Sequence, residues 1–364
     1  MSKTVFILGA GASRDSGAPL MNNFLDEARF LYENDKIDEM FKDDFKRALA
    51  ASDNLYKISQ KSNLDLENIE SVYSLFEMGK FMKKLPGVSN WKDIEKIINS
   101  LKILILYTLD KNITIRVSSG RLYPDGSYMD FVSLMASIKD KDGSFPSIIS
   151  FNYDLALDCA LHYQQLGVDY CLGNSNNHDI KLLKLHGSLN WFQSRESNEI
   201  IPYDFNKINE WYFGMHALDE EDEKVEINLP KKFSKEKITF KEQELLPIPI
   251  IIPPTWNKLE FSYNFEIAKV WQKAAEELSN AENIFVIGYS CPETDNFFKY
   301  FLALGILGEK LIKKFWVFNP DQSIEDRFKN LLGPRINKKF KFEKLPFSET
   351  IKYLDDNSEV PSVR

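Results

Sequence analysis

Short apolar runs alternate with amphipathic segments along much of the chain. Residues 4–8 form a continuous apolar and β-branched run that ends at Gly9, which is typical of a strand buried on both faces of a parallel sheet. The same pattern predicts strands at 147–151, 181–185, 248–252, 283–288 and 315–318. Apolar positions at helical spacing predict helices at 22–32, 155–166, 261–280 and 294–304. Strands that alternate with helices predict right-handed βαβ units and a parallel sheet.

Residues 35–137 differ in composition from the rest of the chain: they are rich in Lys, Asp, Leu and Phe and poor in Gly and Pro. A long helical pattern at 91–109 dominates this region, which we interpret as a helical insertion or subdomain. The expected fold is therefore α/β: a Rossmann-like parallel sheet with helices on both faces, plus a helical insertion. Residues 1–34 and 138–345 would form the discontinuous Rossmann-like domain, 35–137 the insertion and 346–364 a C-terminal tail.

Composition narrows the class of protein. The 364 residues are 43% hydrophobic and 27% charged, as in a globular chain, and the net charge of −8 disfavours a generic nucleic-acid binder. Cys159, Cys171 and Cys291 form no C-x-x-C element, so neither a cysteine-rich zinc site nor a disulfide framework is expected. No apolar run reaches transmembrane length. We expect a soluble cytoplasmic protein with no membrane segment and no metal site.

The first candidate motif is the run Gly9-Ala10-Gly11-Ala12-Ser13, directly after the first strand. Glycines in such a turn let the backbone approach a pyrophosphate, to which the following helix offers N–H groups. The ordinary dinucleotide fingerprint needs a third glycine where Arg14 stands, so this match fails. The alternative is a strand-to-helix turn without a ligand.

Three further polar or glycine-rich turns follow predicted strands. They are Asn152-Tyr153-Asp154, His186-Gly187-Ser188 and Gly288-Tyr289-Ser290. Taken singly, the first favours a plain helix cap, the second is as compatible with a hydrogen-bonded structural histidine as with a functional one, and the third is compatible with a plain turn. Together they place four such turns at the carboxyl ends of strands, which is where parallel sheets bind ligands.

These motifs, in this order, resemble the sirtuin family. A G-A-G-x-S segment followed by S-G-x-P corresponds to Gly9–Ser13 and Ser16-Gly17-Ala18-Pro19. Asn152 and Asp154 match the end of T-Q-N-x-D, His186-Gly187 matches the H-G pair, and Gly288 and Ser290 match G-T-S with Tyr289 substituted. The strand that ends at Asn319 fits the last motif. The resemblance spans most of the chain but not the helical insertion.

Departures from the family pattern are as informative. Leu20-Met21-Asn22 stands where sirtuin deacetylases have D-F-R, and the four-cysteine zinc module has no counterpart. Residues 252–257 replace the segment that presents a peptide. The pattern is similar to the sirtuin-like branch of bacterial anti-phage defence, whose members degrade NAD. It implies a homo-oligomer, a partner such as a helicase-like ATPase or an Argonaute-like protein, and no zinc.

The resemblance implies that NAD is the substrate and is cut between nicotinamide and ribose. Gly9, Ala10, Gly11, Ala12 and Ser13 would hold the pyrophosphate. Asn152 would bind the attacking water or the ribose, and His186 a ribose hydroxyl while it acts as base. Asp154 would orient the nicotinamide carboxamide or brace Asn152. Gly288, Ser290 and Asn319 would contact the adenosine side.

Two other functions stay open from the sequence. A sirtuin-like protein deacylase would release nicotinamide only with an acyl-lysine peptide, and an NAD- or ADP-ribose-sensing module would keep its function when the chemistry is blocked. The helical insertion is either a regulatory surface or a plain cover for the sheet.

Overall fold

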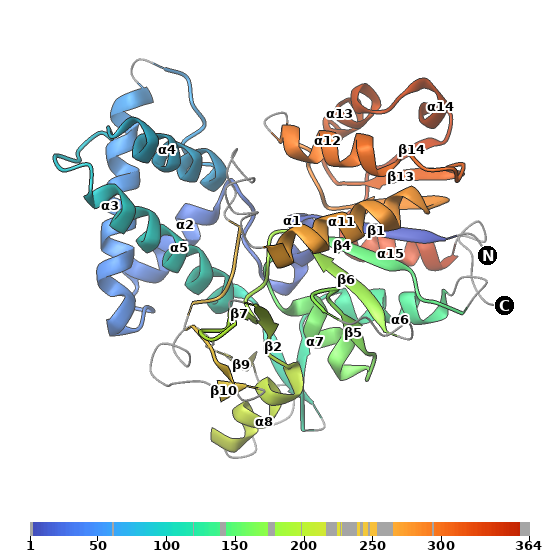
Figure 1. The fold of residues 1–364 in the computed structure, drawn as a ribbon, viewed down its shortest axis with the longest axis horizontal. Helices are drawn as coiled ribbons and strands as arrows, with labels where there is room; N and C mark the ends of the chain where they lie inside the picture. Colours follow the sequence, from blue (N-terminus) through green and yellow to red (C-terminus); the bar gives the residue numbers. More distant parts are fainter. Residues whose placement is uncertain are drawn as a thin grey trace.

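Seven strands form one parallel sheet at the centre of the molecule (Figure 1). The computed structural model describes residues 3–59, 62–118, 120–138, 143–173, 179–197, 199–215, 224–225, 227, 239–240, 243–246, 248–252, 265–292 and 295–356. In spatial order the strands are β14 (Phe340–Glu343), β13 (Lys314–Phe318), β12 (Asn283–Ile287), β1 (Thr4–Leu8), β4 (Ser147–Ser150), β6 (Ile180–Lys184) and β5 (Val168–Asp169). Every neighbouring pair runs parallel.

The sheet is buried on both faces because its strands carry apolar side chains at successive positions. In β1, Val5 and Ile7 belong to one core cluster, whereas Phe6 and Leu8 belong to the other. This alternation is the two-residue period of a strand, and it explains why the run reads as continuously apolar. The predicted α/β class, a Rossmann-like parallel sheet with helices on both faces, is confirmed.

Helices cover each face of the sheet. One core cluster includes residues of α11 (Phe265–Ser279), α12 (Asn296–Gly305) and α13 (Ile324–Leu331). The other includes residues of α6 (Tyr128–Ser137), α7 (Ala156–Tyr163) and α15 (Phe347–Asp356). The aromatic ring of Phe131 on α6 lies 5.3 Å from that of Phe6 on β1 and 5.5 Å from that of Phe347 on α15.

The chain reverses its direction of travel across the sheet at β1. From β1 it moves to β4 and then to β5 and β6, before it crosses back to place β12 on the other side of β1. After β1 the chain continues to β4 on one side, whereas after β12 it continues to β13 on the other side. In open α/β sheets this switch point is where the ligand crevice forms.

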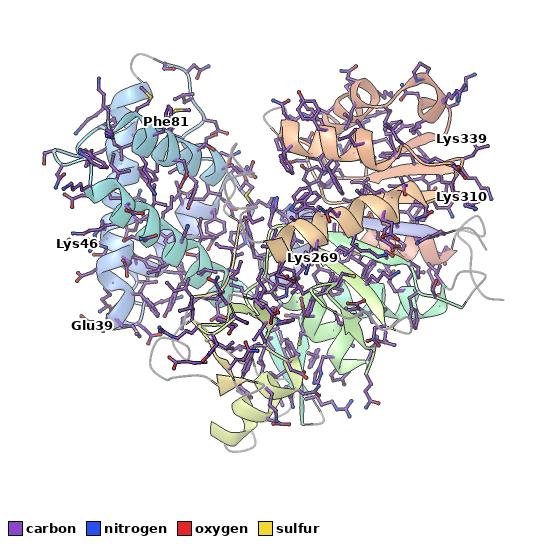
Figure 2. All side chains as sticks on the ribbon, viewed as in Figure 1. Glu39, Lys46, Phe81, Lys269, Lys310 and Lys339 are labelled. Atoms are coloured by element: carbon purple, nitrogen blue, oxygen red, sulfur yellow. The ribbon has the colours of Figure 1, made fainter. Side chains whose placement is uncertain are left out.

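A helical lobe lies to one side of the sheet, away from α12 and α13 (Figure 1). It consists of α2 (Phe24–Glu33), α3 (Glu39–Ser59), α4 (Ile69–Met82) and α5 (Asp93–Asn112). On α3, Phe45 is fully buried and packs edge-on against Tyr107 of α5, with 5.7 Å between ring centroids. Glu39 and Lys46 of the same helix point outward (Figure 2). The lobe thus has its own amphipathic packing.

Short elements complete the described chain. They are α1 (Ala10–Ser13), the 3₁₀ turn η1 (Arg14–Ser16), β2 (Ile115–Ser118), β3 (Arg121–Pro124), β7 (Trp191–Gln193), β8 (Ile200–Pro202), α8 (Phe205–Met215), β9 (Lys224–Val225), β10 (Thr239–Phe240), β11 (Gln243–Glu244) and α14 (Pro334–Asn337). None of the helices in the described ranges combines the length and apolar character needed to cross a bilayer.

Two segments differ from the sequence-based expectation. Residues 248–252 are not a strand of the sheet: Ile251 makes only an isolated antiparallel bridge with Gly187. Pro249 within this run lacks an N–H group, which a strand interior would need. The described part of the predicted tail, residues 346–356, contains α15, whose buried Phe347 packs against Phe131 of α6. Residues 357–364 lie outside the described residues. Residues 261–264, the start of a predicted helix, lie outside the described residues.

A buried carboxylate joins three strands at the amino-terminal edge of the sheet. Glu277 of α11 accepts a hydrogen bond from Ser147 Oγ at 2.7 Å and pairs with Lys3 at 2.7 Å and Lys181 at 3.0 Å. Burial by itself would raise the pKa of Glu277, but the hydrogen bonds and positive charges outweigh it and lower that pKa to about 2.

The free energy of unfolding should therefore depend on the protonation of Glu277. Because its pKa is lowered in the folded state, its contribution is present above about pH 4.5 and disappears as pH falls toward 2. The shift corresponds to about 3 kcal/mol. In denaturant unfolding at pH 7, Glu277→Gln should lower the free energy of unfolding by about this amount. The free energy of unfolding of this variant should also fall less steeply as the pH is lowered. Glu276→Gln, an exposed neighbour on the same helix, is the control, and equal stability of both variants would contradict the assignment.

Candidate active site

A cavity of about 480 Å³ opens at the carboxyl edge of the sheet, where the chain reverses direction. It is within the range of about 300–1,000 Å³ found for small-molecule and cofactor sites. Six strands contribute loops that line it, and Leu345, Pro346 and Phe347 follow the sixth of them, β14. The other five strands carry the residues of the sequence motifs. These lining residues are Ala10 and Gly11 after β1, Phe151, Asn152 and Tyr153 after β4, His186 after β6, Gly288, Tyr289 and Ser290 after β12, and Asn319, Pro320 and Asp321 after β13.

The glycines of the first motif are required by contact between two loops. The amides of Gly9 and Gly11 donate to the carbonyl oxygens of Ile287 and Gly288 at 3.0 and 2.9 Å. A Cβ atom on Gly11 would lie 2.9 Å from the Gly288 Cα. Gly288 itself has φ +66°, and its Cβ would lie 2.5 Å from the Ala12 nitrogen. The loops after β1 and β12 are thus packed backbone to backbone.

This packing limits which residues of the first motif a ligand can contact. The amides of Gly9, Gly11 and Ala12 all donate to backbone oxygens within the protein. Ala10 and Gly11 line the cavity, whereas Gly9, Ala12 and Ser13 do not. The turn therefore shapes the floor of the cavity, and the part of it that a ligand can meet is Ala10-Gly11.

Asn152 is held in one orientation by its amide nitrogen. Its Nδ2 donates to Gly9 O and to Ser13 Oγ, both at 2.9 Å, with the Tyr128 hydroxyl at 3.4 Å. Ser13 Oγ in turn lies 2.9 Å from that hydroxyl. Because Nδ2 is occupied by protein acceptors, the Asn152 group left for a ligand or a water is the acceptor Oδ1. Ser13 thus contributes to the site indirectly, by holding Asn152 in this orientation.

His186 is almost fully buried in the cavity wall among aromatic rings. Its imidazole lies edge-on to Phe151, with 5.1 Å between ring centroids, and 5.9 Å from the ring of Tyr153. Its carbonyl oxygen accepts from the amide of Ile252 at 2.7 Å, and the Ile252 carbonyl accepts from the Tyr153 hydroxyl at 2.7 Å. Residues 248–252 therefore serve the site by fixing the loop that carries His186.

A buried lysine connects the loop of Asn152 to the loop of His186. Lys184 Nζ donates to Asp154 O at 2.7 Å, to Ser188 Oγ at 2.8 Å and to Asp158 Oδ2 at 2.6 Å. Both charged side chains of the Lys184–Asp158 pair are 1% exposed. Tyr170 also donates to Asp158. The ammonium group is thus fully bonded and spans both loops.

Asp154 lies behind the cavity wall. Its Oδ1 accepts from the Ala156 amide at 3.0 Å, at the start of α7, and the residue is not part of the cavity lining. Burial raises the pKa of Asp154, while the positive charge of Lys184 and a hydrogen bond with Ser13 oppose that rise. Of the two roles considered for Asp154, this placement favours bracing the Asn152 loop.

The far end of the cavity is formed by the loops after β12 and β13. Asn319 Nδ2 donates to Tyr289 O at 3.3 Å, and its Oδ1 accepts from the Asp321 amide at 3.0 Å. The exposed Ser290 lines the cavity, and its carbonyl oxygen accepts from Arg327 at 3.2 Å. Asn319 therefore holds these two loops together, and both residues line the cavity.

Several lining residues were not singled out as site residues by the motif analysis. Tyr153 and Tyr289 lie between residues that were, and Asp295 accepts from the Tyr289 hydroxyl at 2.8 Å. Asn68 and Glu70 come from the helical lobe. No motif marks them, because only the packing of α4 brings them to the sheet. Conversely, the buried Ser16 lies outside the lining and donates to Asp125 O at 2.6 Å.

Within the described ranges, no group of three His, Cys, Asp or Glu side chains is placed to hold a metal ion.

Comparisons with known proteins find likeness only in structure. The chain matches no protein-family model and no curated protein. It is similar to a Sir2 homologue in complex with NAD, with 14% identity, a TM-score of 0.40, and coverage of 97% of this chain and 88% of the other. A mutant Sir2 homologue in complex with ADP-ribose has 14% identity and a TM-score of 0.38, and the match covers 97% of this chain and 90% of the other. A structure described as the structural basis for sirtuin substrate affinity has 11% identity and a TM-score of 0.37, and the match covers 98% of this chain and 94% of the other. These identities and scores are low, so the chemistry of the site has to come from its own residues.

Gly288→Ala should lower the melting temperature and weaken ligand binding together. The new Cβ meets the backbone of the loop after β1, which cannot move without separating β1 from β12. Thermal unfolding of Gly333→Ala supplies the control, because a Cβ there has open space. A Gly288→Ala protein that melts like the wild type would show that the two loops are not rigidly packed.

Lys184→Met should destabilise the fold strongly, because it leaves the carboxylate of Asp158 buried without its cation. Loss of one partner of a buried pair costs about 3–5 kcal/mol. Chemical denaturation measures the loss, with Lys207→Met, which removes an exposed ion pair, as the control. Unfolding free energies that agree between the two variants would contradict the role given to Lys184.

Proposed function

We propose that this protein is an NAD glycohydrolase that cleaves NAD to nicotinamide and ADP-ribose. One observation carries the proposal: Asn152 and His186, which follow different strands, line the same cavity as the Ala10-Gly11 turn. An acceptor amide can position a water molecule, an imidazole can accept its proton, and a glycine turn allows the backbone to approach a pyrophosphate. The order of the motifs, which resembles that of sirtuins, supports NAD as the substrate.

The reaction transfers the glycosyl group of NAD to water. The electron pair of the bond between the anomeric carbon and the nicotinamide nitrogen passes to that nitrogen and neutralises the ring. The anomeric carbon passes through an oxocarbenium-like state and bonds to the water oxygen. The proton that water loses is accepted by His186, directly or through a ribose hydroxyl, and then passes to solvent. NAD is thus consumed as a substrate.

Each group of cavity residues has a separate role in this reaction, set by its position. Asn152 Oδ1, fixed by the bonds of Nδ2, accepts from the water or a ribose hydroxyl and keeps it close to the anomeric carbon. Ala10 and Gly11 lie along the pyrophosphate, and Arg14 is the lining residue with a positive charge to face it. Gly288, Ser290 and Asn319 form the end of the cavity for adenosine.

We also propose, from the sirtuin resemblance alone, a biological setting for this activity. An enzyme that drains NAD has to be silent in a healthy cell, so control by assembly is required. Activity would be released in anti-phage defence by formation of a homo-oligomer or by a partner such as a helicase-like ATPase or an Argonaute-like protein. Measurement of nicotinamide release across a range of protein concentrations, beside the mass in solution, tests the dependence on self-assembly.

Incubation of the protein with NAD, followed by chromatography of the products, tests the proposed reaction. Nicotinamide and ADP-ribose should appear in equal amounts without any acylated peptide. Asn152→Ala and His186→Ala should each lower the rate by about 100-fold or more, the usual contribution of a positioned acid–base group. Asn206→Ala and His162→Ala, which lie outside the cavity lining, should keep the rate.

Three experimental outcomes would favour another function or another site over the proposed one. Release of nicotinamide only when an acyl-lysine peptide is added would replace hydrolysis by deacylation. NAD binding without nicotinamide release, by protein whose assembly in solution has been verified, would indicate a sensing module. Equal loss of activity in the His162 and His186 variants would place the chemistry elsewhere.

A further inference from the structure

Two aromatic side chains lie against each other in the cavity wall, at positions where the sirtuin motifs have none. Phe151 stands directly before Asn152, where T-Q-N-x-D has glutamine, and Tyr289 takes the place of the threonine of G-T-S. Their rings are stacked, with 4.8 Å between centroids and 22° between planes. The two residues follow β4 and β12, which flank β1 on its two sides. The two departures from the motif pattern therefore form a single contact between two loops of the cavity.

Tyr289 is held in place by residues at the start of α12. Its hydroxyl donates to Asp295 Oδ2 at 2.8 Å, and Asp295 Oδ1 accepts from the amide of Phe298 at 3.0 Å. The centroid of the Phe298 ring lies 4.5 Å from that of Tyr289. Phe298 is fully buried, and Tyr289 is 8% exposed. A buried ring that is bonded at its hydroxyl and packed against two other rings has little freedom to change rotamer.

Phe151 joins Tyr289 to the imidazole of His186. The rings of Phe151 and His186 meet edge to face, with 5.1 Å between centroids and 70° between planes. The rings of Tyr153 and Trp271 lie farther from the imidazole, with centroids 5.9 and 6.4 Å away. Edge-to-face contacts are directional, because the edge of one ring is attracted to the negative face of the other. The position of Phe151 therefore restricts the direction in which the imidazole points.

We propose that Tyr289 is a positioning residue for His186: its ring, held by α12, keeps Phe151 against the imidazole. This inference rests on the proposed function, because it takes His186 as the group that accepts the proton of water. A proton acceptor has to lie within about 3 Å of its partner, and a misplacement of about 1 Å can lower a rate by about 100-fold. Tyr289 thus affects the reaction through two ring contacts, its own with Phe151 and that of Phe151 with His186.

Two substitutions separate the ring of Tyr289 from its hydroxyl. Tyr289→Phe keeps the stacked ring and loses only the hydrogen bond to Asp295, so kcat for nicotinamide release should stay within about 3-fold of the wild type. Tyr289→Leu leaves Phe151 without its stacked neighbour, and kcat should fall by about 10-fold or more. Phe328→Leu is the matched control and should keep kcat, because it removes a buried ring of the same core cluster that packs against Phe315.

Nuclear magnetic resonance of the full chain with labelled histidine reports the position of the imidazole without any substrate. The ring C–H signals of His186, identified by their absence from His186→Ala, are displaced by the ring current of Phe151. They should move in Tyr289→Leu and stay in place in Tyr289→Phe and Phe328→Leu. The signals of His162, which lies outside the cavity lining, should stay in place in every variant.

Four results would overturn the inference. Unchanged His186 signals in Tyr289→Leu would show that Phe151 keeps its place without Tyr289. Equal displacement of these signals in Phe328→Leu would indicate a general loosening of the core. Equal displacement in Tyr289→Phe would assign the effect to the hydroxyl and not to the ring. Displaced signals with an unchanged kcat would show that the direction of the imidazole does not limit the reaction.

Two further measurements keep the test decisive. If Tyr289→Leu does not fold, Tyr289→Met is measured in the same way, because its flexible side chain fills more of the space left by the ring. Failure of the proposed function is seen separately, as an absence of nicotinamide release from the wild-type protein. The His186 signals are recorded without NAD, so they still show whether Tyr289 positions the imidazole.

Discussion

The ammonium group of Lys184 is buried at the end of β6, where the loops of the two principal site residues meet. It donates to Asp154 O in the loop that follows β4 and to Ser188 Oγ in the loop that follows β6, while Asp158 balances its charge. A buried charge is tolerated only when its bonds and its counter-charge are complete. Any displacement of either loop would break one of these bonds, so the relative position of Asn152 and His186 is fixed by electrostatics.

A second constraint acts on the other side of β1 and is steric. The loops after β1 and β12 approach so closely at Gly11 and Gly288 that neither position has room for a Cβ atom. The carbonyl of Gly9, within this contact, is one of the acceptors that orient Asn152. The steric contact and the charged network therefore meet at Asn152, and a rigid amide of this kind costs little reorganisation during a reaction.

The helical lobe shares a core cluster with one face of the sheet, and the first turn of α4 reaches the cavity. Because Asn68 and Glu70 line the cavity, any event that shifts the lobe would also change the cavity wall. The lobe therefore offers a direct physical route by which assembly or a partner would act on the site.

The sequence by itself determined five of the seven strands of the sheet and the places where the site residues stand along the chain. Strands β1, β4, β6, β12 and β13 were predictable, because a strand buried on both faces carries apolar residues at successive positions. Strand β5 has only two residues and β14 alternates Phe with charged residues, so neither was predicted. The same reasoning placed Gly9–Ser13, Asn152, His186 and Gly288 at strand ends. It was wrong for residues 248–252, where the apolar run instead braces the His186 loop through single hydrogen bonds.

Only the tertiary structure decided which of these residues face the cavity and which stand behind them. Ser13 belongs to the glycine motif and Asp154 to the motif of Asn152, yet both lie behind the cavity wall, whereas Asn152 lines the cavity. Glu70 and Lys184 have no motif at all. Their roles arise from contacts between segments far apart in the chain, and such contacts depend on how helices and loops pack, which local periodicity does not encode.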